Sequence, residues 1–389
     1  MEGQSIIFSL FLIFVGCAVT AALALWARQA LIVGYIVLGV LLGPWGLGWV
    51  DDTNLLADIA KIGIIFLLFM LGLNLAPQKL LSLLKQTTIV TLITSISFSL
   101  FGGILALAFG FVWADALIIG FATMFSSTII GLKLLPTTTL HHQHTGQIII
   151  SVLLLQDLFA ILVMLVIQGY GQGDNQILGV ARQLLALPLL VAIAYVLERW
   201  AIEPLLRRFD QIQEYIFLLV IAWCLGIAQL AAALGLSHEI GAFIAGVALA
   251  SCPASMFIAD SLRPLRDFFL ILFFFSLGAS FDPSMMRQIL VPGCLLAAAM
   301  LLAKPAVFKV LLIRAGERRR VSGEIGVRLG QISEFSLLIA VLAFESGIIG
   351  AQASYVIQLA TLITFIASSY WIVMRHPTPI AVRDSLRRD

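Results

Sequence analysis

Charged residues are scarce in this sequence. They make up 11% of its 389 residues, against about 25% in soluble domains, whereas 61% of the residues are hydrophobic. The mean hydropathy is +1.07. A chain with so few polar groups could not cover the surface of a soluble fold, and it is too apolar to be disordered. The composition therefore excludes a soluble enzyme and a disordered protein.

Patterns of reactive residues are also missing. The four cysteines lie inside apolar stretches, without pairing or metal-binding spacing, and are interpreted as small core residues: Cys17, Cys224, Cys252 and Cys294. The sequence contains no phosphate-binding loop, hydrolytic triad spacing or metal-ligand cluster. Its net charge of +2 gives no reason to expect a nucleic-acid partner. We therefore predict that the chain is not an enzyme and needs no cofactor or resident metal.

Long apolar blocks dominate the chain instead. Most are close to the roughly 20 residues that a helix needs to cross a hydrocarbon core of about 30 Å. The first has no basic residue before it and exceeds the apolar core of a signal peptide, so we expect a retained helix. Thirteen transmembrane helices are predicted, at about 5–27, 30–49, 55–75, 87–112, 115–135, 146–168, 178–198, 214–234, 237–252, 267–281, 288–313, 325–345 and 352–373. The blocks at 237–252 and 267–281 are short enough to be strongly tilted or re-entrant.

The basic residues predict the orientation of these helices. Seventeen of the 23 fall on one side of the thirteen-helix arrangement, and only Arg182 and Arg287 fall on the other. Cytoplasmic loops carry the excess of Lys and Arg, so the N-terminus is expected outside and the C-terminus inside the cell membrane. The triplet Arg318–Arg320 is expected to anchor the chain at the cytoplasmic surface, where it could meet anionic lipid.

Three ionisable residues lie deep within apolar blocks: Asp157, Lys304 and Glu334. A charge at such a depth costs at least about 2.5–3.5 kcal/mol on insertion scales, so each requires a reason. Asp157 is predicted to carry an ion or a proton, the alternative being a structural carboxylate paired with Lys304. Lys304 is expected to be its counter-charge. Glu334 is expected to support an interrupted helix, and a direct role in the site remains the alternative.

Two blocks contain polar steps that suggest interrupted helices. The block at 115–135 holds Thr123, Ser126, Ser127 and Thr128, and the block at 325–345 holds a second set, Gly330, Gln331, Ser333 and Ser336. Such groups can satisfy backbone atoms that an unwound helix frees, although they also join ordinary helix pairs. The blocks occupy corresponding positions if two inverted six-helix halves are joined by the seventh helix. Paired interrupted helices in an inverted repeat indicate a binding site near the membrane midplane.

Six stretches of the chain are Gly34–Pro44, Leu67–Leu73, Leu153–Asp157, Gly235–Gly246, Leu272–Gly278 and Gly330–Phe335. In this order they are similar to motifs of the monovalent cation:proton antiporter-2 family, and within it of the Kef-type potassium/proton exchangers. The resemblance covers nearly the whole chain. It implies an all-α sodium/proton antiporter-like fold with crossed discontinuous helices.

The resemblance also implies a domain organisation. Residues 1–375 would form the transmembrane domain of a homodimer that works as an elevator, with a short cytoplasmic tail at 376–389. Helices 1–3 and 8–10 would form the dimerisation part, and helices 4–6 and 11–13 the moving, ion-carrying part. Kef systems append a nucleotide-binding regulatory domain. Because the chain stops soon after its last apolar block, we expect either a short member of the family or a chain that lacks its C-terminal regulatory domain, with a separate regulatory subunit as a candidate partner.

The family's acidic ion-site residue falls on Asp157, and Gln156 replaces the first of two acids found in electrogenic relatives. The predicted ion-binding and proton-carrying set is Thr123, Ser126, Ser127, Thr128, Gln156 and Asp157, with Lys304 as counter-charge and Gln331, Ser333 and Glu334 as support for the helix break. Two positions depart from the family pattern, because Lys61 stands where relatives often carry Glu and Asn74 where they often carry an acid.

The expected function is exchange of a monovalent cation for H⁺ across the inner membrane, most simply K⁺ and without net charge movement. Two alternatives on the same fold are a gated K⁺ efflux pathway and a Na⁺/H⁺ antiporter. Side-chain identity does not fix the choice between K⁺ and Na⁺, because cavity size and ligand number decide it. Membrane lipid and a second copy of the chain are the expected partners.

Overall fold

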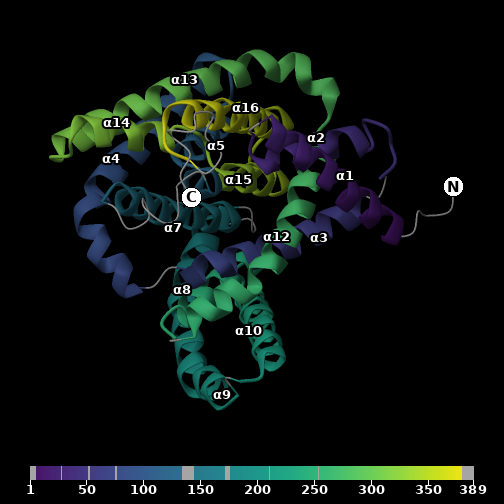
Figure 1. Ribbon diagram of the computed structural model, residues 1–389, viewed down its shortest axis with the longest axis vertical. Helices are drawn as coiled ribbons and strands as arrows, with labels where there is room; N and C mark the ends of the chain where they lie inside the picture. The colour runs from purple at the N-terminus through teal and green to yellow at the C-terminus, as the bar shows by residue number, and fades with distance from the viewer. Residues whose placement is uncertain are drawn as a thin grey trace. The chain divides into compact units, whose positions relative to one another are not determined.

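The computed structural model describes residues 6–27, 29–50, 53–74, 77–133, 144–170, 176–209, 211–252 and 254–378. Helices make up nearly all of this part of the chain (Figure 1). The α-helices are α1 (Ile6–Trp26), α2 (Leu31–Leu42), α3 (Thr53–Asn74), α4 (Pro77–Ala108), α5 (Trp113–Met124), α6 (Thr128–Lys133), α7 (His144–Tyr170), α8 (Gln176–Leu197), α9 (Glu203–Arg208), α10 (Gln213–Ala233), α11 (His238–Leu249), α12 (Ser255–Ala279), α13 (Met286–Arg314), α14 (Arg319–Arg328), α15 (Glu334–Glu345) and α16 (Ala351–Arg375). Two short helices of other types are η1 (Glu198–Ile202) and η2 (Pro283–Met285).

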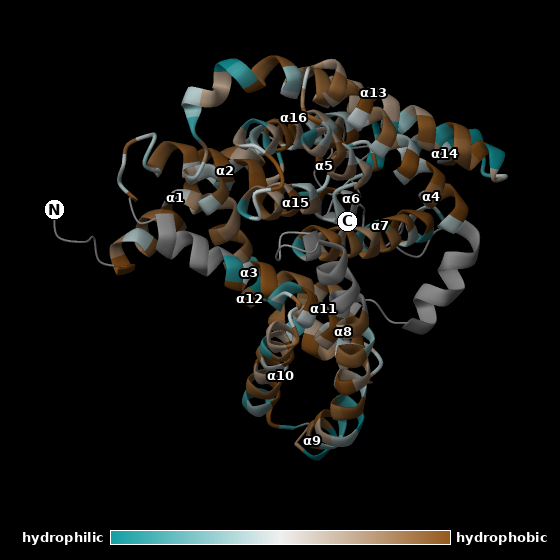
Figure 2. Cartoon of the chain, turned by 180° about the vertical axis from the view of Figure 1, so that it is seen from behind, coloured by the Kyte–Doolittle hydropathy of each residue, from teal (hydrophilic) through white to brown (hydrophobic). Residues whose placement is uncertain are grey.

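Each of the thirteen predicted blocks contains a helix or a broken pair of helices. The fifth block is divided into α5 and α6, and the twelfth into α14 and α15. Seven helical spans among the described residues are long and apolar enough to cross a membrane. Hydrophobic residues cover most of the helices, and hydrophilic ones gather at α9 and at one end of α14 (Figure 2). The protein is a multi-pass α-helical membrane protein.

The tenth predicted helix begins earlier than its sequence suggests. α12 starts at Ser255 and has 25 residues, so the prediction of a short segment at 267–281 was wrong. Arg263 and Arg266 precede the predicted segment at 267–281, but both lie within the helix. Each pairs with a nearby carboxylate, of Asp260 and Asp267 respectively. Arginine favours helices, and the i,i+3 pair of Asp260 and Arg263 adds a small stabilisation, so a charged stretch can continue a helix.

The chain forms two compact units. The first unit comprises residues 1–18, 35–81 and 168–281, and the second comprises residues 19–34, 82–167 and 282–389. In the first unit, α3 packs against both α11 and α12, and α10 packs against α11. In the second unit, α13 packs against α14 and α16, and α15 packs against α5 and α16.

Glycines bring pairs of helices in the first unit into backbone contact. Gly39 of α2 lies against Gly278 of α12, and Gly72 of α3 lies against Gly246 of α11. A Cβ atom at any of the four positions would collide with a carbonyl oxygen of the opposite helix. The second helix of each half therefore crosses the third helix of the other half. The crossing of α2 with α12 therefore corresponds to the crossing of α11 with α3 when one half is compared with the other, as expected for an inverted repeat.

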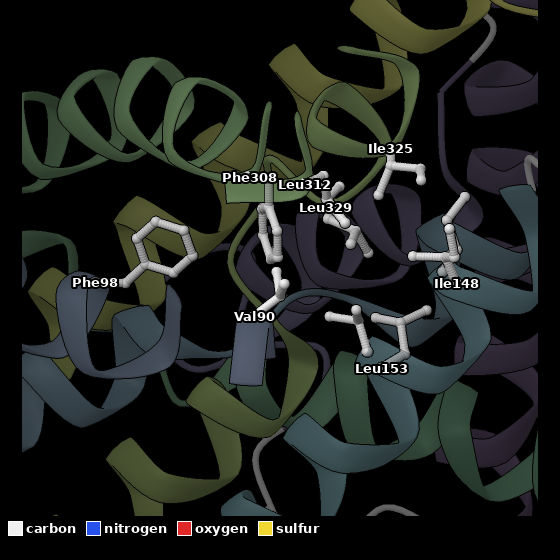
Figure 3. Packing of buried hydrophobic residues seen from close by; sticks show 10 residues of the cluster. Val90, Phe98, Ile148, Leu153, Phe308, Leu312, Ile325 and Leu329 are labelled. Carbon is white, nitrogen blue, oxygen red and sulfur yellow. The ribbon is translucent and has the colours of Figure 1, made fainter. Parts of the chain in front are cut away.

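A cluster of buried apolar side chains holds the helices of the second unit together (Figure 3). Its members come from α4, α7, α13 and α14, and Leu329 directly follows α14. They are Val90, Phe98, Ile148, Ile149, Val152, Leu153, Phe308, Leu312, Ile325 and Leu329. The rings of Phe98 and Phe308 are 5.4 Å apart between centroids, within the range of favourable aromatic pairs. This packing fixes the helices on which the polar residues of the second unit stand.

Candidate functional site

The first helix break lies between α5 and α6, where Phe125 has an extended backbone. The side chain of Gln156, on α7, closes this break from both sides. Its Oε1 accepts a hydrogen bond from the Ser126 N–H at 3.0 Å, and its Nε2 donates to the Met124 carbonyl at 3.1 Å. Within the break, Ser127 Oγ accepts from the Ile130 N–H at 3.1 Å. These bonds satisfy backbone groups that lose their helical partners where the chain unwinds.

The second break, at residues 329–333, separates α14 from α15. Ser333 caps α15, because its Oγ accepts a hydrogen bond from the Phe335 N–H at 3.1 Å. Gln331 Nε2 donates to the Arg328 carbonyl at 3.0 Å. Side chains of α16 provide the remaining support: Thr364 Oγ1 accepts from the Ile332 N–H at 3.1 Å, and Ser368 Oγ donates to Gln331 Oε1 at 3.0 Å.

The two breaks are bonded directly to each other. Ser126 Oγ donates to the Leu329 carbonyl at 2.9 Å, and Gln331 Nε2 lies 3.3 Å from the Ser127 carbonyl oxygen. These bonds join positions about 200 residues apart in the sequence. The predicted crossing of two interrupted helices is therefore present within the second unit.

Lys304 joins the two breaks with a single ammonium group. Its side chain is completely buried, and Nζ donates to the Phe125 carbonyl and, at 2.9 Å, to the Gln331 carbonyl. Nζ also lies 5.3 Å from the centre of the Phe98 ring, within the range of a cation–π interaction. Because Phe125 and Gln331 follow the ends of α5 and α14, the cation lies where helix dipoles favour positive charge. Within the described part of the chain, no ion pair of 4.0 Å or less joins Lys304 to Asp157.

Asp157 is 1% exposed in the middle of α7 and has little hydrogen-bonding support. Thr128 Oγ1 lies 3.3 Å from Oδ1 and 3.2 Å from Oδ2, longer than a typical hydroxyl–carboxylate bond. The Glu334 carboxylate, also buried, is close enough to interact electrostatically with Asp157. A carboxylate so poorly satisfied in a low-dielectric site gains strongly from binding a proton or a cation.

Residues 9–374 match the sequence model of the family described as sodium/hydrogen exchanger, transmembrane. The chain belongs to this family. Its members are cation/proton transporters and not enzymes, so the resemblance found in the sequence is confirmed and the prediction that the chain is no enzyme agrees with it.

Two proteins similar to this chain have names that refer to different transported ions. The chain is 30% identical over 348 residues to the iron transporter MagA of Paramagnetospirillum magneticum, covering 89% of this chain and 80% of MagA. It is 26% identical over 368 residues to the glutathione-regulated potassium-efflux system protein KefC of Klebsiella pneumoniae. That match covers 93% of this chain but 59% of KefC.

A solved structure shows the same fold. The sodium proton antiporter MjNhaP1 from Methanocaldococcus jannaschii, determined at pH 8, superimposes with a TM-score of 0.73. The superposition covers 94% of this chain and 95% of that structure, at 17% sequence identity. The all-α antiporter fold expected from the sequence is therefore present.

The predicted site residues of this exchanger divide into two groups. Asp157 and Thr128 face each other, whereas Ser126, Ser127, Gln156, Gln331 and Ser333 mainly bind the backbone of the two breaks. Thr123 Oγ1 donates to the carbonyls of Phe98 and Gly120, at 3.1 and 2.8 Å. Of the two positions that depart from the family pattern, Lys61 is exposed on α3, and the side chain of Asn74 lies outside the described residues.

Sequence reasoning missed the contribution of α16. A row of buried polar residues on this helix, Ser354, Gln358, Thr361, Thr364 and Ser368, leads to the second break. Their spacing of three or four residues within an apolar block places them on one helix face. This spacing could have predicted that one face of α16 packs against polar groups of the protein, because a helix surrounded by lipid would carry no such polar face.

Proposed function

We propose that the protein is a secondary antiporter that exchanges a monovalent cation, K⁺, for H⁺. The observation that carries this proposal is the buried Asp157 carboxylate, which has one hydroxyl partner and lies at two crossed helix breaks. Cation and proton compete for one carboxylate, because binding either removes the same buried negative charge. Alternating occupancy of such a group couples the two fluxes.

The choice of K⁺ rests on the Kef-type motifs and on the similarity to KefC, which is named as a potassium-efflux protein. One carboxylate supplies one negative charge, which suits a monovalent cation better than the iron named in MagA. MjNhaP1 is named as a sodium proton antiporter, so Na⁺ is the direct competitor to test.

The two compact units support an elevator mechanism with an ion-carrying part and a dimerisation part. Every predicted site residue lies in the second unit, which would move, and the first unit would hold a second copy of the chain. The basic residues favour an inner-membrane protein with its N-terminus outside and its C-terminus in the cytoplasm. The tail beyond residue 378 lies outside the described residues.

Purified protein in liposomes should exchange K⁺ for H⁺ without responding to membrane potential. Gln156 holds the first break as a neutral amide, so Asp157 can carry one proton or one monovalent cation with the same charge on each crossing. Moving one net charge through 100 mV involves about 2.3 kcal/mol, so an electrogenic cycle would shift with voltage. A pH-sensitive dye reports proton flux while K⁺, Na⁺, Rb⁺ and Fe²⁺ gradients are imposed at several clamped potentials.

Three results of this assay would revise the proposal. A reversal point that moves with voltage would require a second charged participant, and Glu334 is the first candidate. Cation flux without an opposite proton flux would indicate the channel-like alternative. Flux driven by Na⁺ or Fe²⁺ and not by K⁺ would replace the proposed substrate.

A further inference from the structure

Arg328 is a fully buried arginine at the end of α14. Its Nε donates to Glu324 Oε1 at 3.0 Å, and its side chain also donates to the Pro377 carbonyl oxygen at 2.8 Å. Pro377 belongs to the segment that follows α16, here called the C-terminal strap and comprising His376, Pro377 and Thr378. The side chain of Thr378 is also completely buried. The guanidinium therefore fastens the strap to α14.

The main chain of the same residue begins the second helix break. The Arg328 carbonyl accepts a hydrogen bond from Gln331 Nε2 at 3.0 Å, and the Gln331 carbonyl accepts one from Lys304 at 2.9 Å. The next carbonyl, that of Leu329, accepts from Ser126 Oγ in the first break. A continuous set of bonds thus runs from the strap through Arg328 to both breaks.

A buried guanidinium makes this connection stiff. Removing a partner from a buried, hydrogen-bonded charge is strongly unfavourable, because the charge stays desolvated without compensation. The strap and the end of α14 therefore move together more readily than they separate. The planar guanidinium can hold Glu324 and the Pro377 carbonyl at fixed directions, which a lysine ammonium cannot reproduce.

We propose that Arg328 is a positioning residue that couples the C-terminal strap to the ion site, so that displacing the strap weakens cation binding at Asp157. The inference rests on the proposed antiport function. A bound protein or a further segment that displaces the chain beyond α16 would thereby also displace the two helix breaks, through the bonds of Arg328. The strap would thereby serve as an input for regulation.

A double-mutant cycle in the full chain tests the coupling. The variants are Arg328→Gln, a strap in which residues 376–378 are replaced by glycine, and their combination. Cation affinity is measured as thermal stabilisation of purified protein by KCl against choline chloride, and the apparent KM for K⁺ is measured in liposomes. The glycine strap keeps the carbonyl at position 377 but loses the buried Thr378 side chain and the Pro377 ring, so it should no longer hold that carbonyl against Arg328. We expect each single variant to weaken the affinity about five- to tenfold, and the combination to weaken it no further, since both disrupt the same connection.

Matched controls separate positioning from general damage. Arg314→Gln removes an exposed arginine at the end of α13 and should leave the affinity unchanged. Arg328→Lys keeps the charge and should recover only part of the affinity. If Arg328→Gln does not fold, Glu324→Gln, which removes only the partner charge, should weaken the affinity by a smaller factor in the same direction.

The outcomes distinguish the inference from the function on which it rests. Wild-type protein that no monovalent cation stabilises would refute the proposed function. A wild-type response that the strap variant leaves unchanged, or effects that multiply in the combination, would refute the coupling alone.

Acid is expected to release the strap. His376 directly precedes Pro377, whose carbonyl is bound by Arg328, and its side chain is partly buried. Burial lowers the pKa of His376, and so do the charges of Arg328 and Arg375, whereas Glu324 acts in the opposite direction. These charged groups belong to α14 and α16. The docked strap binds fewer protons than the released strap, so docking is favoured above the ordinary histidine pKa of about 6.5 and is lost as the pH falls below it.

Cysteine labelling measures this release. In a background without the four native cysteines, Thr378→Cys should become more reactive towards a thiol reagent below about pH 6.5, relative to an exposed reference cysteine. The same measurement with His376→Asn should show no such rise, because the asparagine does not titrate. An equal rise in both proteins would exclude His376 as the sensor.

Discussion

Replacing Asp157 with asparagine should reduce cation-coupled proton movement to the background of empty liposomes, while the protein still folds. Asparagine matches the carboxylate in shape and can accept the Thr128 hydrogen bond, so the surrounding packing is kept. It cannot bind a proton in exchange for a cation. Liposome flux with a pH-sensitive dye, together with thermal unfolding in detergent, measures both parts of this expectation.

Asp260→Asn is a suitable control for this variant. Asp260 lies in the first unit with an exposed side chain paired to Arg263, so its removal should change neither flux nor stability appreciably. Asp157→Asn is also expected to be more stable to heat than the wild type in the absence of cation, because it removes an unpaired buried charge. Exchange at the wild-type rate in Asp157→Asn would rule out the carrier role.

Replacing Lys304 with alanine should cause the largest loss of stability among single substitutions of the site. Two buried carbonyls, of Phe125 and Gln331, would lose their donor. Each buried acceptor left unsatisfied costs about 1–3 kcal/mol, so the expected loss is about 2–6 kcal/mol before any cavity is counted. Thermal unfolding measures the loss, and Lys309→Ala, on the same helix, is the matched control.

A second substitution decides which partner of Lys304 matters. If Lys304 serves as the counter-charge of Asp157, combining Lys304→Ala with Asp157→Asn should restore much of the lost stability. If it mainly holds the two breaks together, the combination should stay as unstable as Lys304→Ala alone. An unchanged melting profile of Lys304→Ala, together with unchanged exchange, would place Lys304 outside the site.

The sequence carried most of the information about the membrane helices. Apolar blocks predicted thirteen segments, and the polar steps located the two breaks close to Phe125 and Gln331. The start of α12 could not be predicted in this way, because basic residues such as Arg263 and Arg266 beside an apolar block are typical of a cytoplasmic loop. Arginine is a good helix former, so these residues can continue a helix as well as anchor a loop.

The detailed bonding of the site was beyond sequence reasoning. Lys304 was expected beside a carboxylate, since the chain offers Asp157 as an obvious opposite charge. Its observed acceptors are backbone carbonyls, and every residue carries a carbonyl, so composition cannot indicate which ones unwinding makes available. The same holds for Arg328 and the Pro377 carbonyl, which are brought together only when α14 packs against α16.

The glycine crossings of the first unit have a consequence for synthesis of the chain in the cell. Gly72 packs against the backbone of α11 around Gly246, and Gly39 packs against the backbone of α12 around Gly278, so these contacts of α2 and α3 are made with residues of the other half. At about 5–20 residues per second, the roughly 170 residues between Gly72 and Gly246 take about 9–34 s to make. During that interval the glycine faces of α2 and α3 must be held by lipid or by the insertion machinery. Assembly of the first unit is therefore a late event, completed only after most of the protein has entered the membrane.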